Sequence, residues 1–302
     1  GQDSVLSVIV NCPEREQNVN VTVPAGLVAN GQGKTYDKDI NVSFQTVGLD
    51  KTPVMATTVE AKKLYNFLLE NVDTKTISGM MANVAWNHTC ADQVNEWTGK
   101  YPAINGFDYV HMAASKAGAD WINYKDITPV QEWADNNGIV QLMWHWNVPK
   151  NEPTTTLDPN KDYDFYVKSD GYPDGTTFDP SNALKEGTWE NEVWKNDMAT
   201  LKEYLTLLKN ANIPVLWRPF HEASGKWFWW GAKDAATFKT LWIEMFNELK
   251  EAGLDNLIWV WTSCGKDDDW YPGDAYVDIV ARDLYGDKAE TCASEFATLG
   301  ST

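Results

Sequence analysis

The sequence lacks the features that mark several large classes of protein. No apolar run approaches the roughly 20 residues needed to cross a bilayer, so no membrane-spanning segment is expected. Basic residues are scarce: 25 Lys and Arg stand against 43 Asp and Glu, which gives a net charge of −18 at pH 7. That charge repels phosphate backbones and anionic lipid surfaces, and it argues against nucleic-acid and peripheral membrane partners. No GxGxxG motif follows the first predicted strand, so a dinucleotide cofactor has no support.

Cysteine is also scarce, and its spacing does not indicate a metal site. The four cysteines are Cys12, Cys90, Cys264 and Cys292, and no two of them form a CxxC pair. His88 lies close to Cys90, but two potential ligands are too few for a zinc site. We therefore expect no metal and no other cofactor. The cysteines permit zero, one or two disulfides, and the sequence does not choose among these.

Aromatic residues, in contrast, are abundant, with 16 Trp, 12 Tyr and 10 Phe. Large flat rings on a strongly acidic chain suit a protein that stacks on an uncharged ligand, and the apolar C–H faces of sugars are such a ligand. The first residues, Gly1 to Val5, show no signal-peptide pattern. We expect a monomer that is secreted, periplasmic or displayed on the cell surface, with its signal peptide removed.

Residues 1–50 differ in pattern from the rest of the chain. Short alternating runs at Ser4 to Val10, Asn18 to Val23 and Asp39 to Val47 are separated by turn formers such as those at 26–33. This pattern predicts a β-rich arm. We expect it to be a structural appendage of the main domain, with a separate sugar-binding module as the alternative, since so short a sheet has little core of its own.

Residues 51–302 read as alternating strands and helices. Helices are predicted at Thr57 to Leu69, Asn191 to Ala211 and Asp234 to Ala252, and Gly253 ends the last of these. Near-continuous apolar strands that alternate with helices indicate a parallel sheet covered by helices. Six such strands are predicted, at Thr76 to Met81, Ala103 to Val110, Ile139 to Trp146, Ile213 to Phe220, Leu257 to Thr262 and Val277 to Leu284.

Polar residues gather at the carboxyl ends of these strands, which is where a (β/α)₈ TIM barrel carries its chemistry. Six βα units are visible, and two more would need about 60 further residues. Either two strands escape recognition, the β-rich arm helps to cover the gap, or the chain is a fragment. Of these, we predict a TIM barrel domain at 51–302 whose C-terminal part is missing before the seventh strand. The long segment at 148–190 is expected to form part of a cleft wall. The polar strand-end residues are Asp108, His145, Asn147, His221, Glu222, Asp283 and Tyr285.

The segment from Leu216 to Gly231, LWRPFHEASGKWFWWG, carries the most information. Pro219 does not fit a strand interior, so the sheet ladder must end or bulge there; Arg218, His221 and Glu222 then lie at the strand's end, with three tryptophans in the next loop. This segment resembles the acid/base strand of glycoside hydrolase family 26, whose best-known members are endo-β-1,4-mannanases. The likeness runs from about residue 57 to 300. Three further segments resemble strands of that family: WHWN at 144–147 followed by Pro149, RDLY at 282–285 and YPAINGFD at 101–108.

The resemblance implies a retaining endo-β-1,4-mannanase that cleaves internal bonds of mannan or glucomannan. It makes Glu222 the general acid/base, and burial beside aromatic rings would raise its pKa so that it is protonated before cleavage. It also implies that Trp227 stacks against the sugar at the cleavage point and that His145 contacts sugar hydroxyls. The other residues assigned to the substrate-binding site are Arg218 and His221 around the carboxylates, Tyr285 as a partner of the nucleophile, Asp283 as an orienting group, and Trp146.

Two acidic segments are predicted to be solvated. The family's nucleophile is a Glu at the end of the seventh strand, and Glu295 is the candidate nearest to that place. Because 289–299 reads as an amphipathic helix with Glu295 at the border of its apolar face, we assign Glu295 to the solvated helix surface and expect the nucleophile beyond Thr302. The acidic run 267–269 lacks the spaced ligands of a calcium loop and is also predicted to be a solvated loop.

Two alternatives remain open at this point. A β-1,3-1,4-glucanase or a β-1,4-xylanase could use the same scaffold, because mannose and glucose differ at one hydroxyl group. A non-catalytic carbohydrate-binding protein could have kept the cleft and lost the nucleophile. Release of reducing sugar from mannan, lichenan and xylan separates these classes.

Overall fold

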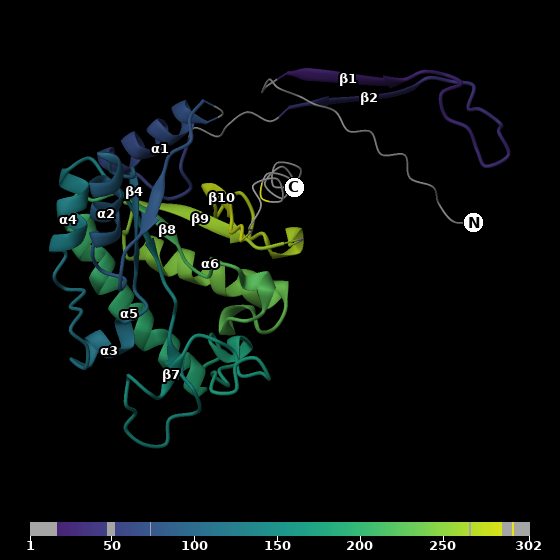
Figure 1. Cartoon of the computed structure of the whole chain (residues 1–302). Helices are drawn as coiled ribbons and strands as arrows, with labels where there is room; N and C mark the ends of the chain where they lie inside the picture. The colour runs from purple at the N-terminus through teal and green to yellow at the C-terminus, as the bar shows by residue number, and fades with distance from the viewer. Residues whose placement is uncertain (1–16, 47–51, 73, 266, 286–291, 293–302) are drawn as a thin grey trace. The chain divides into compact units, whose positions relative to one another are not determined.

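The structure is a computed structural model that describes residues 17–46, 52–72, 74–265, 267–285 and 292 (Figure 1). The chain divides into two compact units, residues 1–52 and residues 53–302. None of the helices in the described part of the chain is long and apolar enough to span a membrane. The predicted strand Ser4 to Val10 and the helix predicted around Glu295 lie outside the described residues.

The described part of the N-terminal unit forms a β-hairpin. Strands β1 (Asn18–Val23) and β2 (Ile40–Gln45) pair antiparallel, with Asn18 opposite Gln45 and Val23 opposite Ile40. Both strands were predicted, and most of their side chains are exposed. A two-stranded hairpin of this size buries too little apolar surface to form a core of its own.

The second unit contains a six-stranded sheet in which every pairing is parallel, in the order β10-β9-β8-β5-β4-β3. This curved sheet is a partial TIM barrel, which confirms the predicted fold class. All six predicted strands are present, and most are shorter than predicted because the polar ends leave the sheet. The strands are β3 (Gly79–Met81), β4 (Ile104–Asp108), β5 (Ile139–Met143), β8 (Val215–Arg218), β9 (Leu257–Ser263) and β10 (Ile279–Arg282).

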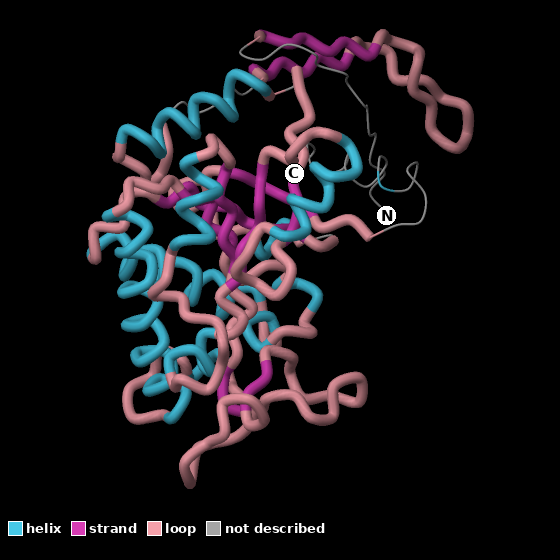
Figure 2. Tube along the Cα trace, turned by 60° about the vertical axis from the view of Figure 1, so that its left-hand side comes forward, coloured by secondary structure: helices cyan, strands magenta, loops and turns pink. Residues whose placement is uncertain are grey.

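The two faces of the sheet are both buried, because successive side chains of a strand point to opposite faces. On one face Leu216 and Ile258 cluster with residues of helix α1 (Val59–Asn71). On the other face Trp217 and Trp259 belong to the main core, together with apolar residues of α5 (Trp189–Asn210) and α6 (Ala235–Glu251). Figures 1 and 2 show α1 near one end of the sheet and the segment around β7 beyond the other end.

Local signals explain where the long helices begin and end. The side chains of Thr58, Thr188 and Asp234 accept hydrogen bonds from backbone N–H groups three residues later, and so cap α1, α5 and α6. Gly253, in the left-handed region at φ +72°, ends α6 as predicted. Three shorter helices were not predicted: α2 (Thr89–Thr98), α3 (Met112–Lys116) and α4 (Thr128–Asp135).

The long segment 148–190 contains the small pair β6 (Val148–Pro149) and β7 (Tyr163–Asp164) and the 3₁₀ turn η1 (Pro180–Asn182). Its backbone joins the loop that follows β8: the N–H of Val167 donates to the carbonyl of Trp227 over 2.8 Å. The segment therefore supports the tryptophan-rich loop. The remaining 3₁₀ turns are η2 (Ala223–Gly225), η3 (Trp229–Gly231) and η4 (Asp268–Trp270).

Candidate active site

Glu222 lies just beyond the carboxyl end of β8, where the chain makes a sharp turn. Pro219 ends the ladder after Arg218, and both Phe220 and Glu222 adopt the left-handed region, at φ +50° and +55°. The N–H of Glu222 donates to the carbonyl of Thr262 at the end of β9, over 3.3 Å. Glu222 is only 6% exposed in this turn.

The carboxyl group of Glu222 has three polar neighbours. The indole N–H of Trp227 donates to its Oε2 over 3.1 Å. Asp283, which follows β10, hydrogen-bonds to Glu222 and adds a negative charge beside it, while Arg218 adds a positive one. Burial raises the pKa of Glu222 most strongly, and Asp283 raises it further. Arg218 and Trp227 lower it by less, so the pKa of Glu222 is raised from 4.5 to about 7. A carboxyl group with this pKa is substantially protonated at neutral pH, as a proton donor requires.

Arg218 contacts Asp283, the acidic neighbour of Glu222. Its Nε donates to the Thr262 hydroxyl over 2.8 Å, and its Nη2 forms an ion pair with the Asp283 carboxylate. Arg218 is 8% exposed, so its charge is balanced inside the protein by Asp283 rather than by water. The structure thus brings Arg218, Asp283 and Glu222, which come from two strand ends far apart in the sequence, into one cluster.

His221, the residue before Glu222, packs against a second histidine, His145. The rings of His145 and His221 meet edge to face, with 4.5 Å between their centroids. Burial, Arg218 and His145 hold the pKa of His221 well below its usual 6.5, so its ring is neutral. Asp108, at the end of β4, binds both Nδ1 and the backbone N–H of His145, the latter over 3.0 Å. Asp108 is therefore the residue that orients His145, whose side chain keeps a quarter of its surface exposed.

Trp227 and Tyr285 are the more open members of the site. Trp227 is partly exposed, and its N–H contact with Glu222 fixes the ring beside the carboxyl. Tyr285 is 87% exposed and lies three residues beyond the end of β10. The roles in sugar and nucleophile binding that the sequence assigns to these two residues remain predictions.

The assignment of Trp146 to the substrate-binding site was wrong. Trp146 is 1% exposed, its ring stacks on Trp144 with 3.9 Å between centroids, and its N–H donates to the buried Asp197 over 2.7 Å. No face of this ring is free for a sugar. The residue lies past the end of β5, where the chain turns back into the core, and the alternation of the strand no longer predicts its direction.

The turn that carries Glu222 is packed against η3 without room for another atom. A Cβ added at Gly231 would collide with the carbonyl oxygen of Ala223 and lie 2.8 Å from its carbonyl carbon. We expect Gly231→Ala to lower the free energy of unfolding of the full-length protein by about 1–3 kcal/mol, since backbone must move. Denaturant unfolding measures this.

Gly171→Ala is the matched control, because a Cβ at Gly171 would approach nothing closer than the Ser169 hydroxyl at 3.9 Å. Its effect should stay within about 0.5 kcal/mol. Equal stabilities of the two variants would show that the η2–η3 approach is not tight.

The acidic run 267–269 is only partly the solvated loop that was predicted. Asp268 and Asp269 are exposed, but Asp267 is 4% exposed and accepts hydrogen bonds from Ser224, Ser263 and the backbone of Cys264. A run of like charges gives no sign that one member turns inward. The only signal available is the run's place directly after a strand end, where barrels concentrate function.

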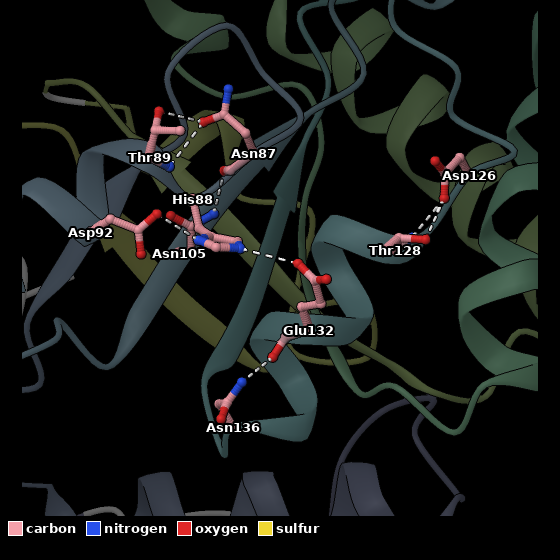
Figure 3. Close-up of polar contacts among 9 residues, drawn as sticks. All are labelled: Asn87, His88, Thr89, Asp92, Asn105, Asp126, Thr128, Glu132 and Asn136. Atoms are coloured by element: carbon pink, nitrogen blue, oxygen red, sulfur yellow. Dashed lines mark hydrogen bonds and ion pairs between the residues drawn. The ribbon is translucent and has the colours of Figure 1, made fainter.

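A second polar cluster lies near β3 and β4 (Figure 3). His88 bridges α2 and α4: its Nδ1 lies 3.0 Å from Asp92 and its Nε2 lies 3.5 Å from Glu132. Asn105, fully buried in β4, donates to the carbonyl of Asn87 over 3.0 Å. Within the described residues no group of three or more His, Cys, Asp or Glu could hold a metal ion. The cluster ties two helices to the sheet.

Comparison with known proteins identifies the family of this chain. The family model of glycosyl hydrolase family 26 matches residues 54–301. The chain belongs to glycosyl hydrolase family 26. The match covers the whole barrel unit and leaves out the N-terminal hairpin, as the sequence resemblance predicted.

Two curated relatives are about one third identical to this chain over the segments that align. A mannan endo-1,4-beta-mannosidase of Thermothelomyces thermophilus is 36% identical over 230 residues, which cover 74% of this chain and 44% of the relative. Mannan endo-1,4-beta-mannosidase A of Piromyces sp is 34% identical over 234 residues, covering 74% of this chain and 35% of the relative. The chain thus spans less than half the length of these relatives.

Two solved structures share the fold of this chain. The family 26 domain of an endo-beta-mannanase/endo-beta-glucanase from Prevotella bryantii has 44% identity and a TM-score of 0.77, covering 83% of this chain and 80% of that one. A beta-mannanase from a symbiotic protist of the termite Reticulitermes speratus, complexed with a gluco-manno-oligosaccharide, has 34% identity and a TM-score of 0.70, covering 85% and 80%.

Proposed function

We propose that this protein is a retaining endo-β-1,4-mannanase in which Glu222 is the general acid/base. The observation that carries the proposal is the Glu222 carboxyl itself, which is buried at the functional edge of the sheet with its pKa raised to about 7. Two relatives of this chain are named mannan endo-1,4-beta-mannosidases, and this supports the choice of substrate. We further propose that the protein is exported, because the proposed substrate is an extracellular polymer. We also propose that it acts as a monomer.

The chemistry proposed for Glu222 has two steps. First, its O–H donates a proton to the glycosidic oxygen while the C1–O bond breaks and a second carboxylate bonds to C1. Then the Glu222 carboxylate accepts a proton from water, whose oxygen bonds to C1 as the enzyme–sugar ester breaks. Retention needs the two carboxyl groups about 5–5.5 Å apart. Guided by the family resemblance, we propose that the second carboxyl group lies at the end of a seventh strand.

The neighbours of Glu222 support these steps in different ways. Asp283 favours the protonated form of Glu222 before cleavage, and the Trp227 N–H favours the carboxylate that cleavage leaves behind. His145, held by Asp108, has a partly exposed ring that can donate to or accept from a sugar hydroxyl. We propose that Trp227 and His145 bind the sugar whose bond is cleaved.

Release of reducing sugar from mannan, lichenan and xylan by the full-length protein tests the proposal. We expect mannan to be cleaved fastest, and proton NMR should show that the first-formed product retains the β configuration. Cleavage of lichenan or xylan alone would assign the protein to another polysaccharide, and inversion would contradict the carboxylate spacing that the mechanism requires. Binding without cleavage would favour a carbohydrate-binding protein.

The contact between Trp227 and Glu222 predicts a change in the pH profile. The Trp227 N–H lowers the pKa of Glu222, so Trp227→Phe, which keeps an aromatic ring and removes the donor, should raise that pKa. The alkaline limb of kcat/KM reports the pKa of the acid in the free enzyme and should therefore move to higher pH. Trp121→Phe is the control, because Trp121 is 73% exposed and far along the chain from the Glu222 turn. A limb that stays in place in both variants would contradict the contact.

A further inference from the structure

The turn that carries Glu222 has an unfavourable backbone conformation that something must hold. Three residues other than glycine adopt the left-handed region within seven positions: Phe220 at φ +50°, Glu222 at +55° and Lys226 at +62°. Such conformations persist only where the surroundings over-determine them. The backbone contact from Glu222 to Thr262, at 3.3 Å, is long and cannot do this alone.

Asp267 supplies a stronger tie between the Glu222 turn and the neighbouring loop. Its Oδ2 accepts from the Ser224 hydroxyl over 2.8 Å and from the Cys264 N–H over 3.0 Å. Its Oδ1 accepts from the Ser263 hydroxyl over 2.6 Å. Ser224 lies two residues after Glu222, whereas Ser263 and Cys264 follow β9. One buried carboxylate thus joins the loops that leave two adjacent strands.

We propose that Asp267 is a positioning residue for Glu222, which it holds at the sheet edge through Ser224. This inference rests on the proposed function, since it assigns Asp267 to the placement of the proton donor. A buried carboxylate suits the task, because it accepts several hydrogen bonds at once and its contacts are charge-assisted. Asp267 does not touch the Glu222 side chain in any described contact, so it acts through the turn.

Asp267→Ala in the full-length protein is the test, with three companion variants. Ser224→Ala removes only the tie to the turn and serves if Asp267→Ala does not fold. Asp267→Asn keeps an acceptor for Ser224 and Cys264 and should restore function. Asp269→Ala is the control, because Asp269 is exposed in the same loop.

The readout separates a misplaced acid from general damage. A glycoside with a poor leaving group needs a proton on the departing oxygen. In a dinitrophenyl glycoside, the dinitrophenolate departs without that proton. We expect Asp267→Ala to lower kcat/KM about tenfold on the first substrate, below the 10²-fold that a 1 Å misplacement can cost, and less than about twofold on the second. Asp267→Asn should stay within about threefold of the wild type on both, and Asp269→Ala should equal it.

The pH profile gives an independent sign. If the turn relaxes towards water, the burial that raises the pKa of Glu222 weakens, and the alkaline limb of kcat/KM should move to lower pH. Asp267→Ala does not remove the other groups that act on Glu222 or respond to its charge, which are Arg218, Tyr166, Trp227, Cys264, Asp283 and Tyr285.

If Asp267→Ala lowers kcat/KM equally on both substrates and leaves the alkaline limb in place, its role is merely structural and the inference is overturned. Wild-type kcat/KM in both Asp267→Ala and Ser224→Ala would overturn it as well. If the wild type cleaves mannan and Glu222→Ala does not, the proposed function stands, whatever the Asp267 variants show. A wild type inactive on mannan would reject the proposed function, and with it this inference.

Discussion

Glu222→Ala should lower the turnover of mannan by the full-length protein by a factor of about 10⁴, the upper range for loss of a general acid. The reason lies in the site: Glu222 is the only group among the described residues that is both buried at the strand edge and raised in pKa to about 7. Initial rates of reducing-sugar release measure the effect.

Binding of the polymer should survive this change. Sugar stacking on rings such as Trp227 does not use the carboxylate, so affinity electrophoresis in mannan should show little change. Glu186→Ala is the control, because the Glu186 side chain is 92% exposed and lies far along the chain from the turn. Cleavage that persists in Glu222→Ala would remove Glu222 from its proposed role, and lost binding would show that the variant had lost its fold.

Arg218→Met should impair stability and chemistry together. Removing one partner of a buried ion pair leaves the other charge uncompensated and costs about 3–5 kcal/mol. Asp283 would then face Glu222 without Arg218, and because Arg218 lowers the pKa of Glu222, that pKa should rise above about 7. The alkaline limb of kcat/KM should move to higher pH, while the free energy of unfolding falls.

Arg218→Lys separates the charge from the shape of the side chain. Lysine keeps the positive charge but lacks the planar fork that reaches both Thr262 and Asp283. We expect a smaller loss of stability and a pH limb closer to that of the wild type. A Met variant as stable as the Lys variant would mean that the pair contributes little in the folded protein.

The parallel sheet could be predicted because its signal is local and repeated. A strand such as Leu257–Ser263, apolar at nearly every position, fits only a sheet buried on both faces, and α6 carries its own start and stop at Asp234 and Gly253. Helix α2, by contrast, begins at His88 without a capping side chain and buries one residue, Ala91, so its apolar pattern is weak.

Placement of single side chains was harder to predict. Glu222, Arg218 and Asp283 could be placed at strand ends, because the carboxyl ends of parallel strands meet at one edge. The inward turn of Trp146 depends on the partners Asp197 and Trp144, of which Asp197 lies on a distant helix. The burial of Asp267 depends on Ser224, 43 positions away. Contacts of this kind are fixed by the assembled fold and leave no local pattern.

The most direct test of the central claim is a titration of the Glu222 carboxyl group itself. Carbon-13 NMR of the full-length protein, labelled at the glutamate carboxyl carbons, can be compared with that of Glu222→Gln to find the resonance of Glu222. We predict that this resonance titrates near pH 7, well above the ordinary value of 4.5. Titration at or below 4.5 would mean that Glu222 is ionised at neutral pH and would contradict its role as the proton donor.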